Sequence, residues 1–111
     1  MANTADTSWK QNIVQVTYAG TGADWNCLTD MGLKTLKVKS IVWHPTAADD
    51  ILVINEGGID GPSILHTKAS AASDTKVKYF GENGTWMTPY IDLTDCTFGT
   101  VTSTKIIFEL A

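Results

Sequence analysis

The chain has 111 residues, enough for one folded domain, and its 43% hydrophobic content excludes a disordered polypeptide. The net charge is −4 and all eight basic residues are lysine, so neither a nucleic-acid partner nor bidentate binding of phosphate by arginine is expected. No apolar run approaches the roughly 18 residues of a transmembrane helix, so no membrane partner is expected.

The first eleven residues differ from the rest of the chain. Residues 1–11 are mostly polar and are expected to form a flexible N-terminal arm, with Trp9 as its one large apolar side chain. They lack the basic start and the apolar stretch of a secretory signal. Residues 12–111 are then expected to form a single β domain.

Strands are predicted where apolar and polar residues alternate, and also over residues 51–55, an almost wholly apolar run of the kind expected in a strand covered on both sides. In chain order they cover residues 13–18, 36–44, 51–55, 63–66, 75–80, 86–91 and 101–110. Glycine-, asparagine- and aspartate-rich segments separate them, and these residues tolerate the backbone of tight turns. In the first strand, Val14, Val16 and Tyr18 are expected to face the core.

One short helix is predicted over residues 24–32. Asp24 is its expected N-cap and Gly32 its expected C-cap, with Trp25 and Leu28 on one side. Seven or eight short strands and so little helix predict an all-β protein, a small jelly-roll-like β-sandwich with a polar N-terminal arm.

The strand over residues 36–44 determines how His44 is interpreted. Alternation predicts two faces, one with Leu36, Val38, Ser40 and Val42, the other with Lys37, Lys39, Ile41 and Trp43. His44 then lies on the inward face beside Val42, just before Pro45. We interpret it as a hydrogen-bonded residue at the rim of the core rather than as a ligand.

Metal binding is not predicted. His44 and His66 would need a third ligand such as Asp49 or Asp50, and the close spacing of zinc ligands is missing. The neighbouring aspartates Asp49 and Asp50 are interpreted as turn and capping residues, as are Asp92 and Asp95.

Catalysis is not predicted either. The chain has no Gly-x-Ser-x-Gly turn, and its two cysteines, Cys27 and Cys96, are far apart in the sequence. Without a secretory signal we expect both to be reduced thiols. The expected protein is therefore not an enzyme and carries no cofactor.

Tryptophans and lysines supply the candidate interface residues. Trp43 is expected in the core. Trp9, Trp25 and Trp86 lie in or near loops and the arm, where an exposed indole anchors a protein partner or stacks on a sugar, and where burial is an equally open alternative.

Five lysines lie on, or just before, two predicted strands. Lys34, Lys37 and Lys39 follow one strand, and Lys76 and Lys78 alternate along another. If the strands are neighbours, the lysines form a basic stripe suited to an acidic protein partner. The alternative is a solvated face, or edge lysines that discourage unwanted sheet pairing. The candidate interface residues are Trp9, Lys37, Lys39, Lys76, Lys78, Trp25 and Trp86.

Two runs, KVKSIVWHPTAADDILVINEGG and KVKYFGENGTWMTPYIDL, join these features in one pattern. With them the chain resembles the capsid staple or decoration proteins of short-tailed phages of the epsilon-fifteen kind. The resemblance covers about residues 10–110 and lies in the overall pattern, since no short motif is diagnostic. It implies a jelly-roll-like fold, a homo-oligomer such as a dimer, and no enzymatic activity. It also implies synthesis in the host cytoplasm and binding to the major capsid protein on the outer capsid surface of the virion.

Two other functions remain open from the sequence. A carbohydrate-binding module of a host-recognition apparatus would use the loop tryptophans beside Asn83, Asp92 and Asp95. A small metal-dependent hydrolase would use His44, His66 and Asp50, and has the weakest support because its ligand spacing is not that of known metal sites.

Overall fold

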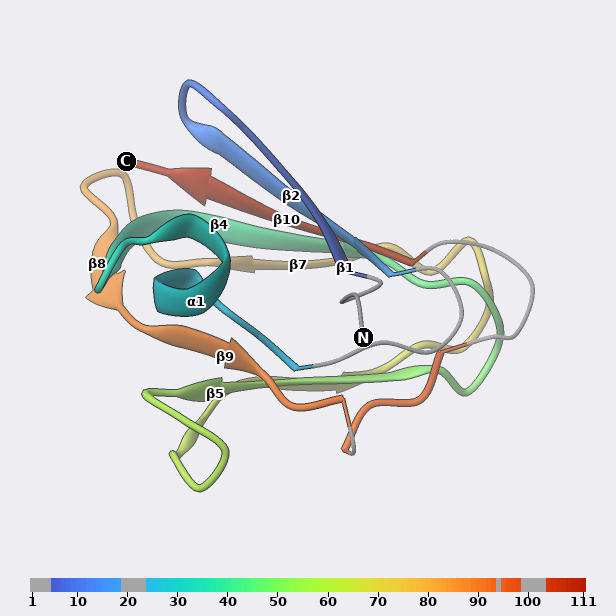
Figure 1. The fold of residues 1–111 in the computed structure, drawn as a ribbon. Coiled ribbons are helices and arrows are strands. Elements are labelled where there is room, and N and C mark those ends of the chain that lie inside the picture. The colour runs from blue at the N-terminus through green and yellow to red at the C-terminus, as the bar shows by residue number, and fades with distance from the viewer. Residues whose placement is uncertain (1–4, 19–23, 94, 99–103) are drawn as a thin grey trace.

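The computed structural model describes residues 5–18, 24–93, 95–98 and 104–111, which form two packed sheets (Figure 1). In chain order the elements are β1 (Ala5–Lys10), β2 (Ile13–Tyr18), β3 (Trp25–Asn26), α1 (Cys27–Met31), β4 (Leu36–His44), β5 (Ile51–Glu56), β6 (Ser63–Lys68), β7 (Lys76–Tyr79), β8 (Thr85–Met87), β9 (Pro89–Ile91) and β10 (Thr104–Leu110).

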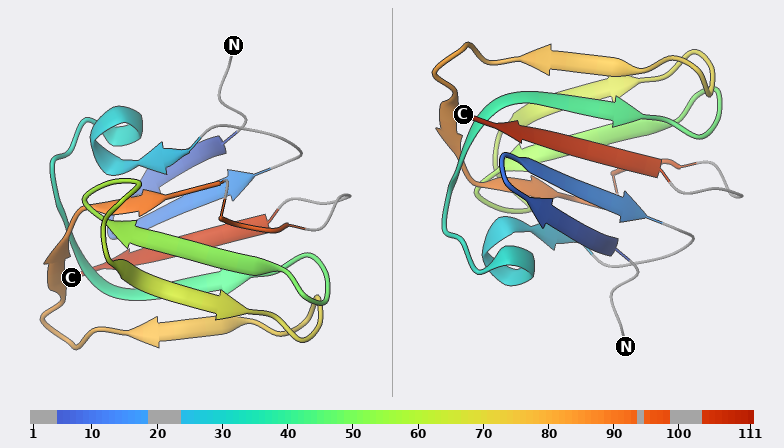
Figure 2. Two further views of the ribbon diagram at one scale, coloured as in Figure 1. Left: turned by 90° about the horizontal axis from the view of Figure 1, so that it is seen from below. Right: turned by 90° about the horizontal axis from the view of Figure 1, so that it is seen from above.

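The strand order identifies the architecture. The larger sheet has the order β1-β2-β10-β4-β7, with β8 also pairing with β4, and the smaller sheet has the order β3-β9-β5-β6. The antiparallel pairs β2–β10, β3–β9, β4–β7 and β5–β6 are therefore nested within one another (Figure 2). Nested pairs shared between two sheets make a jelly roll, so the predicted all-β, jelly-roll-like sandwich is confirmed.

The core lies between the two sheets. Val14, Val16 and Tyr18 of β2 point into it, as alternation predicted. Trp25 of β3 stacks on Phe108 of β10, with ring centroids 5.4 Å apart, so an aromatic contact joins the smaller sheet to the larger one. The prediction that the almost wholly apolar run 51–55 is covered on both sides is confirmed, because the interior of β5 is buried on both of its faces.

The faces of β4 differ from the prediction in its second half. Glu109 pairs with Ser40 but Leu110 pairs with Val38, so Lys39 is one extra residue, a β-bulge. The bulge shifts the alternation by one residue. Trp43 therefore faces the core with no exposed surface, while His44 is exposed on the outward side. The inward position predicted for His44 is wrong, although its Nδ1 does lie 3.3 Å from Thr75 Oγ1.

The sequence suggested that residues 5–10 belong to a flexible arm outside the domain, but the structure places them in the larger sheet. They form β1, which pairs with β2 along its whole length. Thr7 and Trp9 lie opposite two buried valines, and the Thr7 hydroxyl accepts a hydrogen bond from the Trp25 indole N–H at 2.9 Å. The predicted boundary at residue 11 is wrong because an edge strand exposes much of both faces and so carries few apolar residues. Residues 1–4 lie outside the described ranges.

The helix is shorter than predicted. Its N-cap is Asn26, whose side chain accepts from the Thr29 backbone N–H at 2.8 Å, whereas Gly32 is the C-cap, as predicted. Trp25 belongs to β3 and is buried, while Leu28 is exposed, so they do not share a side. In the described ranges, no helix combines the length and apolar character needed to cross a bilayer.

Gly84 closes the turn between β7 and β8 against the end of the chain. Its φ is +71°, and an added Cβ would lie 2.6 Å from the Ala111 Cβ. We expect Gly84→Ala to lower the free energy of unfolding by about 1–3 kcal/mol, measured by urea denaturation. Gly57→Ala is the matched control, because Gly57 has φ +85° but open space around it. Equal losses in the two variants would contradict the steric part of the argument.

Candidate functional site

The register of the larger sheet places one set of side chains on its outward side. Residues directly opposite each other in a ladder project to the same side. Ile107 lies opposite Gln15 and Val42, and Val42 lies opposite Val77. Together with the neighbouring pairs, the residues with described side chains that form what we call the outer face are Ser8, Lys10, Ile13, Gln15, Thr17, Lys37, Lys39, Ser40, Val42, His44, Val77, Tyr79, Trp86, Lys105, Ile107 and Glu109.

The outer face is unusually apolar for a surface. Seven large apolar side chains are exposed in the described part of the chain, and four of them, Ile13, Val77, Tyr79 and Trp86, belong to this face. Their exposed fractions run from 50% to 66%, so solvent reaches at least half of each side chain. Grouped exposed apolar side chains mark interaction surfaces more often than scattered ones do.

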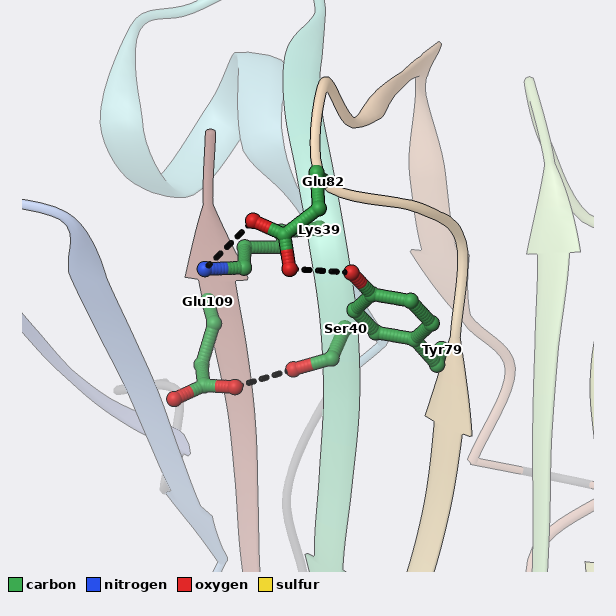
Figure 3. Close-up of polar contacts among 5 residues, drawn as sticks. All are labelled: Lys39, Ser40, Tyr79, Glu82 and Glu109. Atoms are coloured by element: carbon green, nitrogen blue, oxygen red, sulfur yellow. Dashed lines mark hydrogen bonds and ion pairs between the residues drawn. The ribbon is translucent and has the colours of Figure 1, made fainter.

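Hydrogen bonds fix the polar groups at one end of the outer face (Figure 3). Glu82, in the turn after β7, accepts from the Tyr79 hydroxyl at 2.8 Å, and its other oxygen lies 4.0 Å from Lys39 Nζ. Glu109 accepts a hydrogen bond from the Ser40 hydroxyl. Both carboxylates are thus engaged by groups of the same chain.

The lysines of the outer face are less well matched. Lys37 Nζ lies 5.8 Å from the centroid of the Trp86 ring, a cation–π contact. Between described side chains the ion pairs are Lys39–Glu82, Lys68–Asp49 and Lys76–Asp74, so Lys10, Lys37 and Lys105 have no ion pair there. The outer face is therefore basic on a chain whose net charge is −4.

The predicted lysine stripe does not form. β4 and β7 are neighbours, as the stripe required, but Lys76 and Lys78 lie opposite core residues of β4 and so project to the inward side of β7. Lys78 Nζ donates to the backbone oxygen of Ile64 in β6 at 2.7 Å, and Lys76 pairs with Asp74 at 3.0 Å. The stripe is wrong because strand neighbours alone do not decide which way a side chain points.

The three candidate tryptophans are separated by the fold. Trp25 is fully buried, so its predicted place at an interface is wrong. Trp9 is half exposed on β1, opposite Val14, and its indole N–H donates to the backbone oxygen of Gln11 at 3.2 Å. Only Trp86 lies on the outer face.

The candidate metal ligands are not brought together. His44 lies on the outward side of the larger sheet, and His66, opposite Val53, lies on the outward side of the smaller sheet. Asp50 is buried and accepts from Thr46 N at 2.9 Å, as its predicted capping role requires. No three His, Cys, Asp or Glu side chains in the described ranges are grouped to hold an ion. The ligand set that the hydrolase hypothesis requires, His44, His66 and Asp50, is therefore not assembled.

The two cysteines are separate thiols. Cys27 is buried with its Sγ 3.7 Å from the backbone oxygen of Lys34, and Cys96 contacts the backbone of Val53. Burial raises the pKa of the Cys27 thiol and raises that of Cys96 to about 11. Neither is a thiolate at neutral pH, so neither is an activated nucleophile.

The residues proposed for sugar binding are also dispersed. Asp92 is buried, and its charge raises the pKa of the neighbouring Asp95, which lines a shallow hollow with Asp60 and His66. That hollow lies on the smaller sheet, whereas Trp86 lies on the outer face of the larger one. No tryptophan borders the hollow, so it lacks a stacking platform.

All three tyrosine side chains should ionise at a higher pH than an ordinary phenol, because their pKa values are raised. Burial raises the pKa of Tyr18, the hydrogen bond to Glu82 raises that of Tyr79, and the hydrogen bond to Asp24 raises that of Tyr90 to about 12. An ultraviolet titration should therefore show less than half of the phenols ionised at about pH 10, the ordinary midpoint. Because these pKa values are raised, the stability that the phenols contribute persists below about pH 10 and falls as the pH rises toward 12.

Glu82→Gln is the control for that titration. It removes the carboxylate beside Tyr79 and should return the pKa of that phenol toward its usual value, while the pKa values of the other two phenols stay raised. Three phenols ionising together near pH 10 in the unmodified protein would contradict the hydrogen bonds described here.

Comparison of the chain with models of known protein families, with curated proteins and with solved structures found no match. The outer face is therefore the candidate site on its geometry and charge alone.

Proposed function

We propose that this protein is a non-enzymatic phage capsid decoration protein that binds the outer surface of the assembled shell and clamps neighbouring major capsid protein subunits. The observation that carries the proposal is the outer face, where exposed apolar side chains and lysines share one side of a sheet. The resemblance of the sequence to capsid staple proteins supports the same role. It also suggests a homo-oligomer, such as a dimer, on the capsid surface.

The size of the molecule suits this role. A standard protein interface buries about 800 Å² on each partner. That is about an eighth of the 6003 Å² surface of this chain, so one sheet face can supply most of it. A copy that touches two subunits at once prefers the assembled shell to free subunits, and binding at 100 times the Kd stabilises the bound state by about 2.7 kcal/mol.

The fold is compatible with two of the functions considered. Jelly rolls occur in viral capsid proteins and in lectins, so the architecture does not choose between shell binding and sugar binding. The positions of the side chains favour shell binding over sugar binding. Trp25 and Asp92 are buried, and Trp9 and Trp86 lie on strands separated by β2, β10 and β4, so no sugar platform forms from them.

The test is binding to shells that lack the protein. Empty shells of the phage whose genome carries this chain are mixed with the purified protein and sedimented. We expect the protein to sediment with the shells, to ignore unassembled capsid subunits, and to raise the temperature at which shells disrupt. Absence of co-sedimentation, together with an unchanged disruption temperature, would refute the proposed function.

A further inference from the structure

We infer that the outer face binds an acidic patch on the capsid subunit, and that it is not a surface for a second copy of itself. This inference rests on the proposed function and adds the chemistry of the partner. It follows from where the lysines of the outer face lie and from what already occupies the carboxylates near them.

The lysines border the apolar centre of the outer face, which we define as the central row of Ile107, Val42 and Val77 across three neighbouring strands. Along β10, Lys105 and Glu109 flank Ile107, so one ammonium group lies directly beside this row. Lys37 lies toward the other end of the outer face, on β4, and Lys10 lies beside Ile13 at the β1 edge. A partner that covers the apolar centre must therefore bring its own rim close to three ammonium groups that have no ion pair between described side chains.

The lysines of the outer face, Lys10, Lys37, Lys39 and Lys105, outnumber its described carboxylates, Glu109 and the neighbouring Glu82. Glu82 is held by Tyr79 and Lys39, and Glu109 is held by Ser40. Two outer faces packed together would place lysines against lysines, and like charges at an interface are costly. Any dimer of this protein must therefore use another surface, and the complement of this face is an acidic one.

A hollow marks where an acidic side chain would sit. Gln15, His44, Lys105 and Ile107 line a shallow depression of about 470 Å³ beside the central row. It offers an ammonium group and an imidazole next to an apolar wall. A carboxylate of the partner placed there would meet the Lys105 charge while its neighbours cover Ile107.

Charge at a rim acts mainly on the rate of association and on its salt dependence, whereas the apolar centre supplies most of the affinity. We therefore expect shell binding to weaken as salt rises above about 0.1 M, where the screening length is about 10 Å. The apolar centre should be sensitive to a buried charge at any salt concentration.

The experiment compares two charge reversals on the intact chain. Lys105→Glu changes the rim of the outer face, and Lys68→Glu makes the same change at an exposed lysine of the smaller sheet. In the shell sedimentation assay at low salt we expect Lys105→Glu to weaken binding about fivefold or more and Lys68→Glu to stay within about twofold. A higher salt concentration should reduce the difference in shell binding between the two variants.

A second pair tests the apolar centre. Val77→Asp places a carboxylate opposite an acidic partner, and Ile59→Asp makes a similar change at an exposed apolar residue that lines the hollow of the smaller sheet. We expect Val77→Asp to reduce shell binding at least tenfold and Ile59→Asp to leave it nearly unchanged. Near-ultraviolet circular dichroism confirms that each variant is folded.

The outcomes separate the two proposals. If the unmodified protein does not bind shells, the proposed function fails and the inference fails with it. If it binds with no salt dependence, and Lys105→Glu behaves like Lys68→Glu, the inference alone is overturned. A dimer in sedimentation equilibrium that Val77→Asp dissociates would also overturn it, because the outer face would then contact a second copy.

Discussion

Replacing Trp43 by alanine is expected to lower the free energy of unfolding by about 3–5 kcal/mol, a large share of the stability of a small domain. The indole has no exposed surface. Its N–H donates to the Thr104 hydroxyl at 2.8 Å, and that hydroxyl donates to the backbone oxygen of His44 at 3.0 Å. Alanine would leave a cavity and remove a hydrogen bond that ties β4 to β10.

Urea denaturation of two further variants separates the contribution of the indole N–H from that of burying the ring. Trp43→Phe keeps most of the ring but removes the N–H, and should cost less than alanine does. Trp86→Ala truncates a side chain that is 66% exposed, and should change stability by no more than about 0.5 kcal/mol while weakening shell binding. Similar unfolding midpoints for Trp43→Ala and Trp86→Ala would contradict the placement of these two residues.

Removing residues 1–10 is expected to destabilise the fold itself, because β1 is a strand of the larger sheet. The deletion exposes one side of β2 and leaves the buried Trp25 indole without its acceptor, Thr7. An unsatisfied buried donor alone costs about 1–3 kcal/mol. The shortened chain should therefore unfold at a lower urea concentration than the whole one.

A pair of point variants separates the indole from the rest of the strand. Thr7→Ala removes the acceptor and should account for most of that 1–3 kcal/mol, whereas Thr7→Ser keeps a hydroxyl and should cost little. If the shortened chain were as stable as the full one and lost only shell binding, residues 5–10 would act as the flexible arm that the sequence suggested.

Most strands could be predicted from the sequence because their inward faces are strongly apolar. The bounds of β2 and β4 agree with the alternation over residues 13–18 and 36–44. The bulge at Lys39 could not be predicted, since no local feature of KVKS marks an extra residue. The alternation was therefore right before the bulge and wrong after it, which reversed the side assigned to His44.

The candidate site was predicted only in part. Lys37, Lys39 and Trp86 were recognised as interface candidates, whereas Val77 and Tyr79 were missed. Both alternate with Lys76 and Lys78, and alternation cannot tell which set faces outward on an edge strand. The register with β4 decides it, and register depends on residues distant in the sequence. Ile13 and Lys105 were missed because only the sheet order places β10 beside β4, and β2 beside β10.

The ammonium group of Lys78 has a consequence for the protein at high concentration. It is held by the Ile64 carbonyl, so it spans the gap between the outermost strands of both layers, β7 and β6. A foreign strand that tried to extend either layer there would have to displace a charged group and strip it of water. Unwanted strand pairing, and with it growth into fibrils, is therefore discouraged on this flank.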